Sequence, residues 1–329
     1  MSLRHPRRLA LLAGIALLAA SAALSGCGIV GKQSDSVGDT GGEHLLVFAT
    51  DRAGGGDVAL YDLDAGGYRT LPNLNSALLE SEPCLSEDGA LIAFSSNRTG
   101  GAGGEDVYIY GRGSKGVLDV PNLNTAANET WPRFAWDNVR LAFVRDSLGW
   151  NRIRLYDPRG DSLITLRGIG AVGAFHDGQP SPDLHADRIA FVSDRSGRDQ
   201  VYVWNRVGGL ASPPGLTAGD GADAEPWLSS NGRWLAFASN RSGGAGGWDV
   251  YLYDLTNSAF VRLGRLNTAG DERHPSVSAA ASRLFFQQRA SNLVDWDLHG
   301  YTIADSTVRN WPNLSDSTAN DVSPAMRWR

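Results

Sequence analysis

One sequence motif occurs six times between Leu45 and the end of the 329-residue chain, and this repetition constrains the fold more than any single residue does. Each copy has one apolar run that ends in phenylalanine and a second that ends in tyrosine or tryptophan, and a proline separates the copies. Successive phenylalanines stand 46 to 49 residues apart. A period of about 40–50 residues is typical of a propeller blade or a helical solenoid. The three markers are Phe48, Phe94, Phe143, Phe191, Phe237 and Phe286; Tyr61, Tyr110, Tyr156, Trp204, Tyr253 and Tyr301; and Pro83, Pro132, Pro180, Pro226, Pro275 and Pro324.

The apolar runs within each copy favour strands over helices. Runs such as Leu91–Phe94 and Val107–Tyr110 are short and β-rich, and clusters of Gly, Asn, Asp and Ser separate them. The 40 glycines of the chain would also make helical repeats costly. Four strand-sized runs recur in each copy. The sequence therefore predicts an all-β fold, a six-bladed β-propeller of four-stranded antiparallel blades over residues 44–329.

The order of the repeats predicts how the ring closes. The repeats begin in mid-copy, at the run that ends in Phe48, and finish with the run from Pro324 to Trp328. In the other blades, the run that follows the proline is expected to form the first strand, and the first blade lacks such a run at its start. We therefore expect the C-terminal strand to join the first blade and close the propeller.

Residues 1–26 have the features of a lipoprotein signal peptide. Three arginines at positions 4, 7 and 8 precede the apolar stretch Leu9–Ala23, which is too short for a comfortable bilayer span. The following Leu24-Ser25-Gly26-Cys27 resembles the bacterial lipobox. This resemblance implies lipidation at Cys27, and two or three acyl chains there would give a stable anchor. The alternative is an ordinary signal peptide followed by an unrelated cysteine.

The segment after the signal peptide and the overall charge limit the partners. Residues 27–43 are rich in Gly, Ser and Asp, which predicts a lipidated, flexible tether. By resemblance to lipoproteins of double-membrane bacteria, Gly28 after the cysteine implies the outer membrane, on the side facing the periplasm. The net charge of −6 without basic runs argues against a nucleic-acid partner. We expect a monomer that touches the membrane through its lipid alone, with Cys84 as a half-buried strand residue.

The repeats resemble a known family. The segments Ile92–Arg98, Ile189–Gly197 and Glu225–Gly232 are similar to the WD-like β-propeller repeats of TolB-type proteins. The resemblance covers about residues 45–329 and implies the propeller fold, and its motifs say little about function. The chain departs from the pattern where Ser147 replaces the expected arginine and where Arg289 is shifted by one position. The additional N-terminal α/β domain of TolB-type proteins is not expected in residues 28–43.

A carboxylate stands three residues before each proline of the repeat. One interpretation is an acidic ring at the channel mouth, which could bind Ca²⁺ or attract a basic partner. The other is that each acid pairs locally with an arginine of a loop on the same face, or caps backbone amides. The third and sixth copies lack an arginine at the usual position of the loop. This predicts that Asp177 and Asp321 are the free carboxylates and the candidate Ca²⁺ ligands. No other cofactor is expected. The six residues are Glu80, Glu129, Asp177, Asp223, Glu272 and Asp321.

Two glycine-rich loops are the second candidate site. Gly100–Gly104 and Gly243–Gly247 lengthen the second and fifth copies, and 11 of 14 residues agree between Asn97–Tyr110 and Asn240–Tyr253. Opposite blades would carry these loops, so they could flank the channel mouth and contact a partner. Recent duplication explains the same likeness without a function. The candidate contact residues are Gly101, Gly104, Gly244, Gly247 and Trp248.

The motifs favour a binding protein over an enzyme. Gly111–Gly116 matches the letters of a dinucleotide-binding loop but opens onto a strand, and no metal-binding histidine spacing occurs. We therefore expect a cell-envelope lipoprotein whose propeller is a non-catalytic scaffold for an envelope protein partner. One alternative is a propeller that binds glycan or peptidoglycan, with Ca²⁺ in the channel; another is a propeller lyase or lactonase. Three converging His or carboxylate side chains would favour the enzyme, and an apolar patch on the loop face would favour protein binding.

Overall fold

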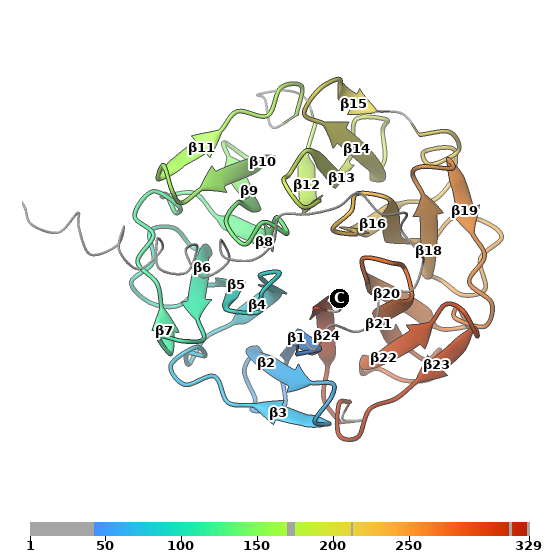
Figure 1. Cartoon of the computed structure of the whole chain (residues 1–329), viewed down its shortest axis with the longest axis horizontal. Helices are drawn as coiled ribbons and strands as arrows, with labels where there is room; N and C mark the ends of the chain where they lie inside the picture. Colours follow the sequence, from blue (N-terminus) through green and yellow to red (C-terminus); the bar gives the residue numbers. More distant parts are fainter. Residues whose placement is uncertain (1–42, 170–174, 212, 316–317, 328–329) are drawn as a thin grey trace, which may run out of the picture. The chain divides into compact units, whose positions relative to one another are not determined.

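The computed structural model describes residues 43–329, apart from 170–174, 212, 316–317 and 328–329. The regular elements of these residues are 24 strands in six four-stranded antiparallel sheets. The sheets surround a common axis as six blades (Figure 1). The predicted six-bladed propeller is confirmed. The predicted signal peptide, Cys27 and all of the predicted tether except Glu43 lie outside the described residues. Within the described residues no helix is long and apolar enough to cross a membrane.

The strands of each blade are given from the axis outwards. Blade 1 contains β24 (Asp321–Arg327), β1 (Leu45–Thr50), β2 (Asp57–Asp62) and β3 (Gly67–Arg69). Blade 2 contains β4 (Glu80–Leu85), β5 (Leu91–Ser96), β6 (Asp106–Gly111) and β7 (Gly116–Val117). Blade 3 contains β8 (Glu129–Phe134), β9 (Leu141–Ser147), β10 (Trp150–Asp157) and β11 (Ser162–Ile164).

The other three blades follow the same order. Blade 4 contains β12 (Asp177–Pro182), β13 (Arg188–Ser193), β14 (Gln200–Asn205) and β15 (Gly209–Ala211). Blade 5 contains β16 (Asp223–Leu228), β17 (Trp234–Ser239), β18 (Asp249–Asp254) and β19 (Ala259–Val261). Blade 6 contains β20 (Asp271–Val277), β21 (Arg283–Arg289), β22 (Asp297–Thr302) and β23 (Thr307–Arg309).

The ring closes through the C-terminal strand, as predicted. β24 pairs antiparallel with β1, with Met326 opposite Leu46 and both side chains buried. Beyond this pairing, Arg327 donates hydrogen bonds to the backbone oxygens of Glu43 and Glu87, each at 2.5 Å. The two ends of the described chain and the neighbouring blade 2 are therefore held together.

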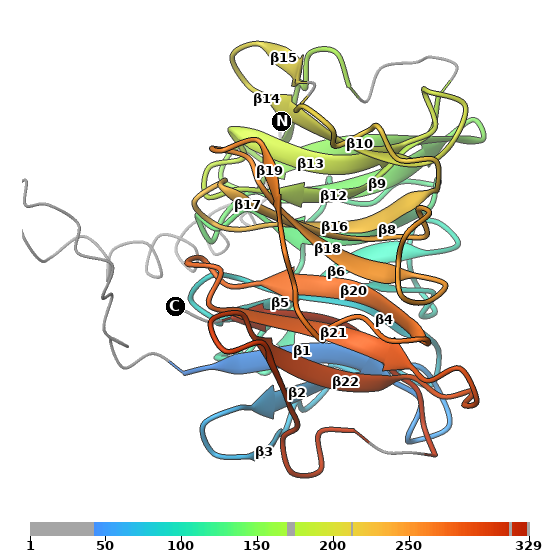
Figure 2. The same ribbon diagram turned by 90° about the vertical axis from the view of Figure 1, so that its right-hand side faces the viewer.

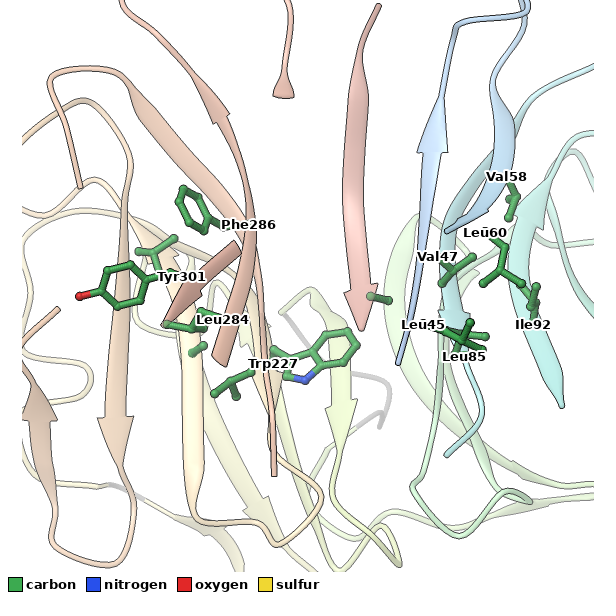
Figure 3. Packing of buried hydrophobic residues seen from close by; sticks show 14 of the residues in the cluster. Leu45, Val47, Val58, Leu60, Leu85, Ile92, Trp227, Leu284, Phe286 and Tyr301 are labelled. Atoms are coloured by element: carbon green, nitrogen blue, oxygen red, sulfur yellow. The ribbon is translucent and has the colours of Figure 1, made fainter. Parts of the chain in front are cut away.

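The repeated aromatic residues join neighbouring blades. The six marker phenylalanines are fully buried. Figure 3 shows this packing at close range, with Val47 and Leu60 of blade 1 near Ile92 of blade 2. In five of the six blades, the marker tyrosine or tryptophan also donates a hydrogen bond to a carbonyl of the connector from the preceding blade. The pairs are Tyr61–Pro312, Tyr110–Pro72, Trp204–Arg167, Tyr253–Pro214 and Tyr301–Gly264.

The propeller has two faces that differ in their loops (Figure 2). The distal face carries the loops between the second and third strands of each blade and the ends of the connectors that lead into the next inner strand. The proximal face carries the other loops, together with the start of the described chain. There His44 bonds through Nδ1 to Asp64 at 2.7 Å before entering β1. The chain therefore enters the propeller on the proximal face.

Candidate functional site

The six repeated carboxylates lie in local pairs instead of an exposed ring. Five open an inner strand and Glu272 is the second residue of β20, and none of the six residues is more than 6% exposed. Each carboxylate accepts a hydrogen bond from a side chain on or after the second strand of its own blade. The donors are Arg98 to Glu80 (3.0 Å), Arg145 to Glu129 (2.6 Å), Arg195 to Asp177 (2.6 Å), Arg241 to Asp223 (2.7 Å), Gln288 to Glu272 (2.7 Å) and Arg52 to Asp321 (2.5 Å).

The prediction that Asp177 and Asp321 are free carboxylates is wrong. Each acid follows one copy of the sequence repeat but opens the next blade, so its partner comes from the next copy. Asp177 pairs with Arg195, and Asp321 pairs across the ring closure with Arg52. Neither residue is therefore available as the predicted Ca²⁺ ligand without losing an arginine.

The irregular arginines are in blades 3 and 6. In blade 3, Glu129 uses Arg145, which lies inside β9. In blade 6, Arg289 bonds to Asp271 and leaves Glu272 to the amide of Gln288. Among the six repeated carboxylates, as far as the structure describes their contacts, Glu272 alone bonds to a glutamine of the second strand where the other five bond to an arginine.

A second ring of residues, which the sequence did not reveal, lines the axis. The residue before each repeated proline has a positive φ, and the register of every inner strand shifts at this point. Such a bulge leaves an amide without a ladder partner, which suits a proline. Left-handed backbone at a residue other than glycine is costly and persists only where its surroundings hold it. These residues, which we call the axial ring, are Glu82 (φ 51), Trp131 (φ 54), Gln179 (φ 51), Glu225 (φ 56), His274 (φ 48) and Ser323 (φ 55).

Two members of the axial ring meet across the axis. Trp131 of blade 3 and His274 of blade 6 stack with their ring centres 5.9 Å apart and their planes within 5° of parallel. Gln179, Glu225 and Ser323 line the same space. The cavity that remains has a volume of about 10 Å³, enough for about one water molecule. The axis is therefore occupied by side chains at this level.

The two glutamates of the axial ring have opposite electrostatic environments. Burial alone would raise the pKa of Glu225, but contacts with His274 (Nε2, 3.0 Å) and Arg273 (Nη2, 2.5 Å) lower it to about 2. Burial raises the pKa of Glu82 to about 7, although it accepts hydrogen bonds from the Trp131 amide at 2.6 Å and Ser95 at 3.0 Å. At neutral pH Glu225 is an ion and Glu82 is partly protonated.

Across the part of the chain that the structure describes, no group of three or more His, Cys, Asp or Glu side chains is placed to hold a metal ion. Cys84 is a buried free thiol on β4. The convergence of three such side chains that would favour an enzyme is not found among these residues.

The glycine-rich loops lie on the distal face and pack against the next blade. A Cβ atom on Gly103 would meet the backbone oxygen of Ala127, and one on Gly246 would meet that of Gly270. The four candidate glycines are exposed to solvent, but each has a close neighbour on one side, and a Cβ on Gly101 or Gly244 would strike an aspartate of its own blade. A Cβ on Gly104 would approach Asn128 at 2.9 Å, and one on Gly247 would approach Asp271 at 2.5 Å. The close approach of neighbouring segments therefore suffices to explain why glycine occupies these positions.

The candidate contact residue Trp248 packs against an arginine of blade 6. Its side chain is half-buried, and the guanidinium of Arg273 lies 4.3 Å from its ring centre. Because Arg273 also pairs with Glu225, Trp248 is connected to the axial ring instead of projecting into solvent.

The distal face carries more exposed apolar side chains than the proximal face does. Of the large apolar residues that the structure shows exposed, only Leu184 and Val207 lie in proximal loops. Six others occupy the outermost strands, one in each blade: Tyr68, Val117, Leu163, Leu210, Phe260 and Val308. The remaining six are on the distal face: Leu78, Leu79, Leu148, Phe175, Leu293 and Val294.

The distal face is also acidic. Three of its arginines, Arg52, Arg98 and Arg195, bond to buried carboxylates, which neutralise their charges. A second set of carboxylates remains exposed or half-exposed in the distal loops. These are Asp51, Asp199, Asp220 and Asp295. The face therefore combines apolar contacts with negative charge.

These features define the class of protein, a six-bladed β-propeller closed by its C-terminal strand. No family model matches the chain. Over 78 residues, 24% of this chain and 17% of the other, it is 33% identical to the Tol-Pal system protein TolB of Desulfosudis oleivorans. The chain thus matches a small part of that relative's length.

Solved structures show the same fold. TolB from Acinetobacter baumannii superposes with a TM-score of 0.65 at 17% identity, covering 86% of this chain and 66% of that one. The putative TolB from Agrobacterium tumefaciens gives 0.60 at 14% identity, covering 82% and 88%. Oligogalacturonate lyase from Vibrio parahaemolyticus, an enzyme, gives 0.53 at 11% identity, covering 80% and 73%. The predicted resemblance to TolB-type propellers is confirmed at the level of fold.

Proposed function

We propose that this protein is a cell-envelope propeller that binds another envelope protein through its distal face and catalyses no reaction. The observation that carries the proposal is the distal face itself, where exposed apolar side chains lie among unneutralised carboxylates. These apolar side chains come from blades 2, 3, 4 and 6, and we infer that they supply the apolar contacts with the partner. The name of the relative in Desulfosudis oleivorans, a Tol-Pal system protein, agrees with a role in an envelope assembly.

The place where the chain enters the propeller agrees with a membrane anchor. The described chain begins on the proximal face, opposite the proposed binding face. If Cys27 carries the lipid, the sixteen residues 28–43 can span up to about 55 Å. The tether would then join the propeller on the face opposite the distal face and leave the distal face open to a partner; we propose that the membrane is the outer membrane, on its periplasmic side.

Pull-down of the full-length, lipidated chain from its native envelope after crosslinking tests the proposal. Leu148→Asp with Val294→Asp places charges at two exposed apolar positions of the distal face, and Val207→Asp places one in a similarly exposed proximal loop. We expect the distal variant to recover at least 10-fold less partner than the unchanged protein, and the proximal variant to recover as much. Equal recovery by both variants would place the binding surface elsewhere.

A titration with Ca²⁺ separates this proposal from the channel-metal alternative. Because Asp177 and Asp321 are already paired with arginines, we expect no saturable heat in calorimetry. A saturable heat that Asp177→Asn with Asp321→Asn abolishes would instead establish a metal site in the propeller.

A further inference from the structure

A groove at the distal edge of blade 5 has the properties of a ligand site, and it includes none of the exposed apolar residues of the distal face. It lies between β18, β19, the loop that joins β17 to β18 and the connector that leads to blade 6. Its volume is about 420 Å³, within the usual range for small-molecule sites. Among its lining residues are Tyr251, Phe260, Arg241, Arg262 and Asn267.

One wall of the groove is aromatic and rigidly held. The rings of Tyr251 and Phe260 lie 6.0 Å apart at 72°, and Phe260 is 42% exposed. The guanidinium of Arg241 lies 4.9 Å from the Tyr251 ring centre and 5.3 Å from that of Phe260. Because Arg241 is itself fixed by Asp223 at 2.7 Å, the wall is preformed.

The rim of the groove offers a cation. Arg262 is exposed, and within the described residues it makes no hydrogen bond or ion pair. The amide of Asn267, in contrast, is neutral and is held by the backbone of Val250, from whose N–H it accepts a hydrogen bond (2.9 Å) and to whose carbonyl it donates one (3.0 Å). Arg262 is therefore the polar group of the groove that is open to an anion.

Blade 2 gives an internal comparison. Its second hairpin is almost identical to that of blade 5, but the outer strands differ. Phe260 stands opposite Tyr253, whereas Val117 stands opposite Tyr110. Two residues further on, Arg262 of blade 5 corresponds to Asp119 of blade 2. The copy in blade 5 alone combines an aromatic side chain with a positive charge at these two positions.

We propose that this groove binds a carboxylated sugar unit. The negative face of an aromatic ring attracts the C–H face of a sugar ring. A guanidinium binds a carboxylate through two parallel hydrogen bonds, which are stronger than bonds between neutral groups. Phe260 with Tyr251 supplies the first contact and Arg262 the second. An acidic peptide satisfies the second contact but has no rigid C–H face for the first.

Calorimetry on the full mature protein tests the proposal with four probes. These are tri-galacturonate, the disaccharide of N-acetylglucosamine and N-acetylmuramic acid, the neutral sugar maltotriose and the peptide tri-glutamate. We expect saturable binding of at least one acidic sugar, and binding at least 10-fold weaker for maltotriose and tri-glutamate. The acidic sugar that binds more tightly distinguishes a free uronate from a cell-wall glycan. No binding of either acidic sugar, or equal binding of maltotriose or tri-glutamate, would overturn the proposal.

Variants locate the site. Phe260→Val with Arg262→Asp gives blade 5 the residues of blade 2 and should weaken acidic-sugar binding at least 10-fold. Arg262→Ala should weaken acidic-sugar binding as well. Because this change is at an exposed side chain, it still tests the site if the double variant misfolds. The matched change Val117→Ala with Asp119→Asn in blade 2 should leave affinity unchanged. Full affinity in Arg262→Ala, or an equal loss in the blade 2 variant, would exclude this groove. Because the distal variants Leu148→Asp and Val294→Asp lie outside the groove, they should bind the sugar normally even if the proposed function fails.

Discussion

Glu82 and Glu225 occupy the same position in opposite blades, yet their surroundings tune them in opposite directions. Glu225 faces His274 and Arg273, whereas Glu82 has the Trp131 amide and Ser95. The partners of Glu225 come from the next blade, about 48 residues further along the chain. These contacts join different repeats, so the sequence of a single repeat does not predict them.

Glu82→Gln should make the protein more stable at pH 8 and change it little at pH 5. The folded pKa of Glu82, about 7, is above the ordinary value of 4.5, so the folded state binds the proton more tightly. The wild type therefore loses stability as the pH rises from about 4.5 to 7, by at most about 3 kcal/mol. Glutamine removes this loss. Thermal melts of both proteins at pH 5 and pH 8 measure it, and a variant that is no more stable at pH 8 would contradict the assignment.

Glu225→Gln should have the opposite pH dependence. The folded pKa of Glu225, about 2, is below its ordinary value, so its contribution is present above about pH 4.5 and is lost as the pH falls towards 2. Because the change leaves Arg273 without its partner, we expect a loss of about 3–5 kcal/mol at pH 7. Denaturant unfolding at pH 7 and pH 3 should show the difference shrinking at the lower pH. A constant difference would mean that packing, not charge, is responsible.

At the scale of strands and loops, the sequence predicted which strands exist and in what order they occur. It predicted poorly which side chains contact one another. The Phe and Tyr markers located the second and third strands because burial between blades repeats with the fold. The acids were assigned to the wrong blades because the sequence repeat and the structural blade are out of phase by one strand, as Asp177 with Arg195 shows. The axial ring was missed because side-chain identity varies from Glu82 to Ser323 while the backbone conformation is constant.

Gly246→Ala should destabilise the protein by about 1–3 kcal/mol. The added methyl group would meet the backbone oxygen of Gly270 in the connector to blade 6, and backbone moves less readily than a side chain. Gly55→Ala, in the shorter loop of blade 1, has open space around the new Cβ and should change stability by less than about 0.5 kcal/mol. Urea unfolding of the two variants makes the comparison. Equal effects would show that the glycines of blade 5 are not required by packing.

For the whole molecule, stability depends on closure of the ring by β24. Deletion of residues 322–329 removes nearly all of this strand and leaves β1 as an unpaired edge. We expect a large fall in melting temperature and loss of a single cooperative transition, because every blade packs against two neighbours. Deletion of residues 328–329 alone keeps β24 intact and serves as the control. A truncated protein that melts like the control would show that the ring does not need its closing strand.

The proposed function requires that a partner touch the distal face and not the proximal one. Site-specific photocrosslinkers at Leu148, Val294 and Val207 in the full-length chain, activated in living cells, measure this directly, since all three side chains are highly exposed. We predict a discrete adduct with an envelope protein from the two distal positions and none from Val207. An adduct from Val207 alone, or no adduct from either distal position, would contradict the account.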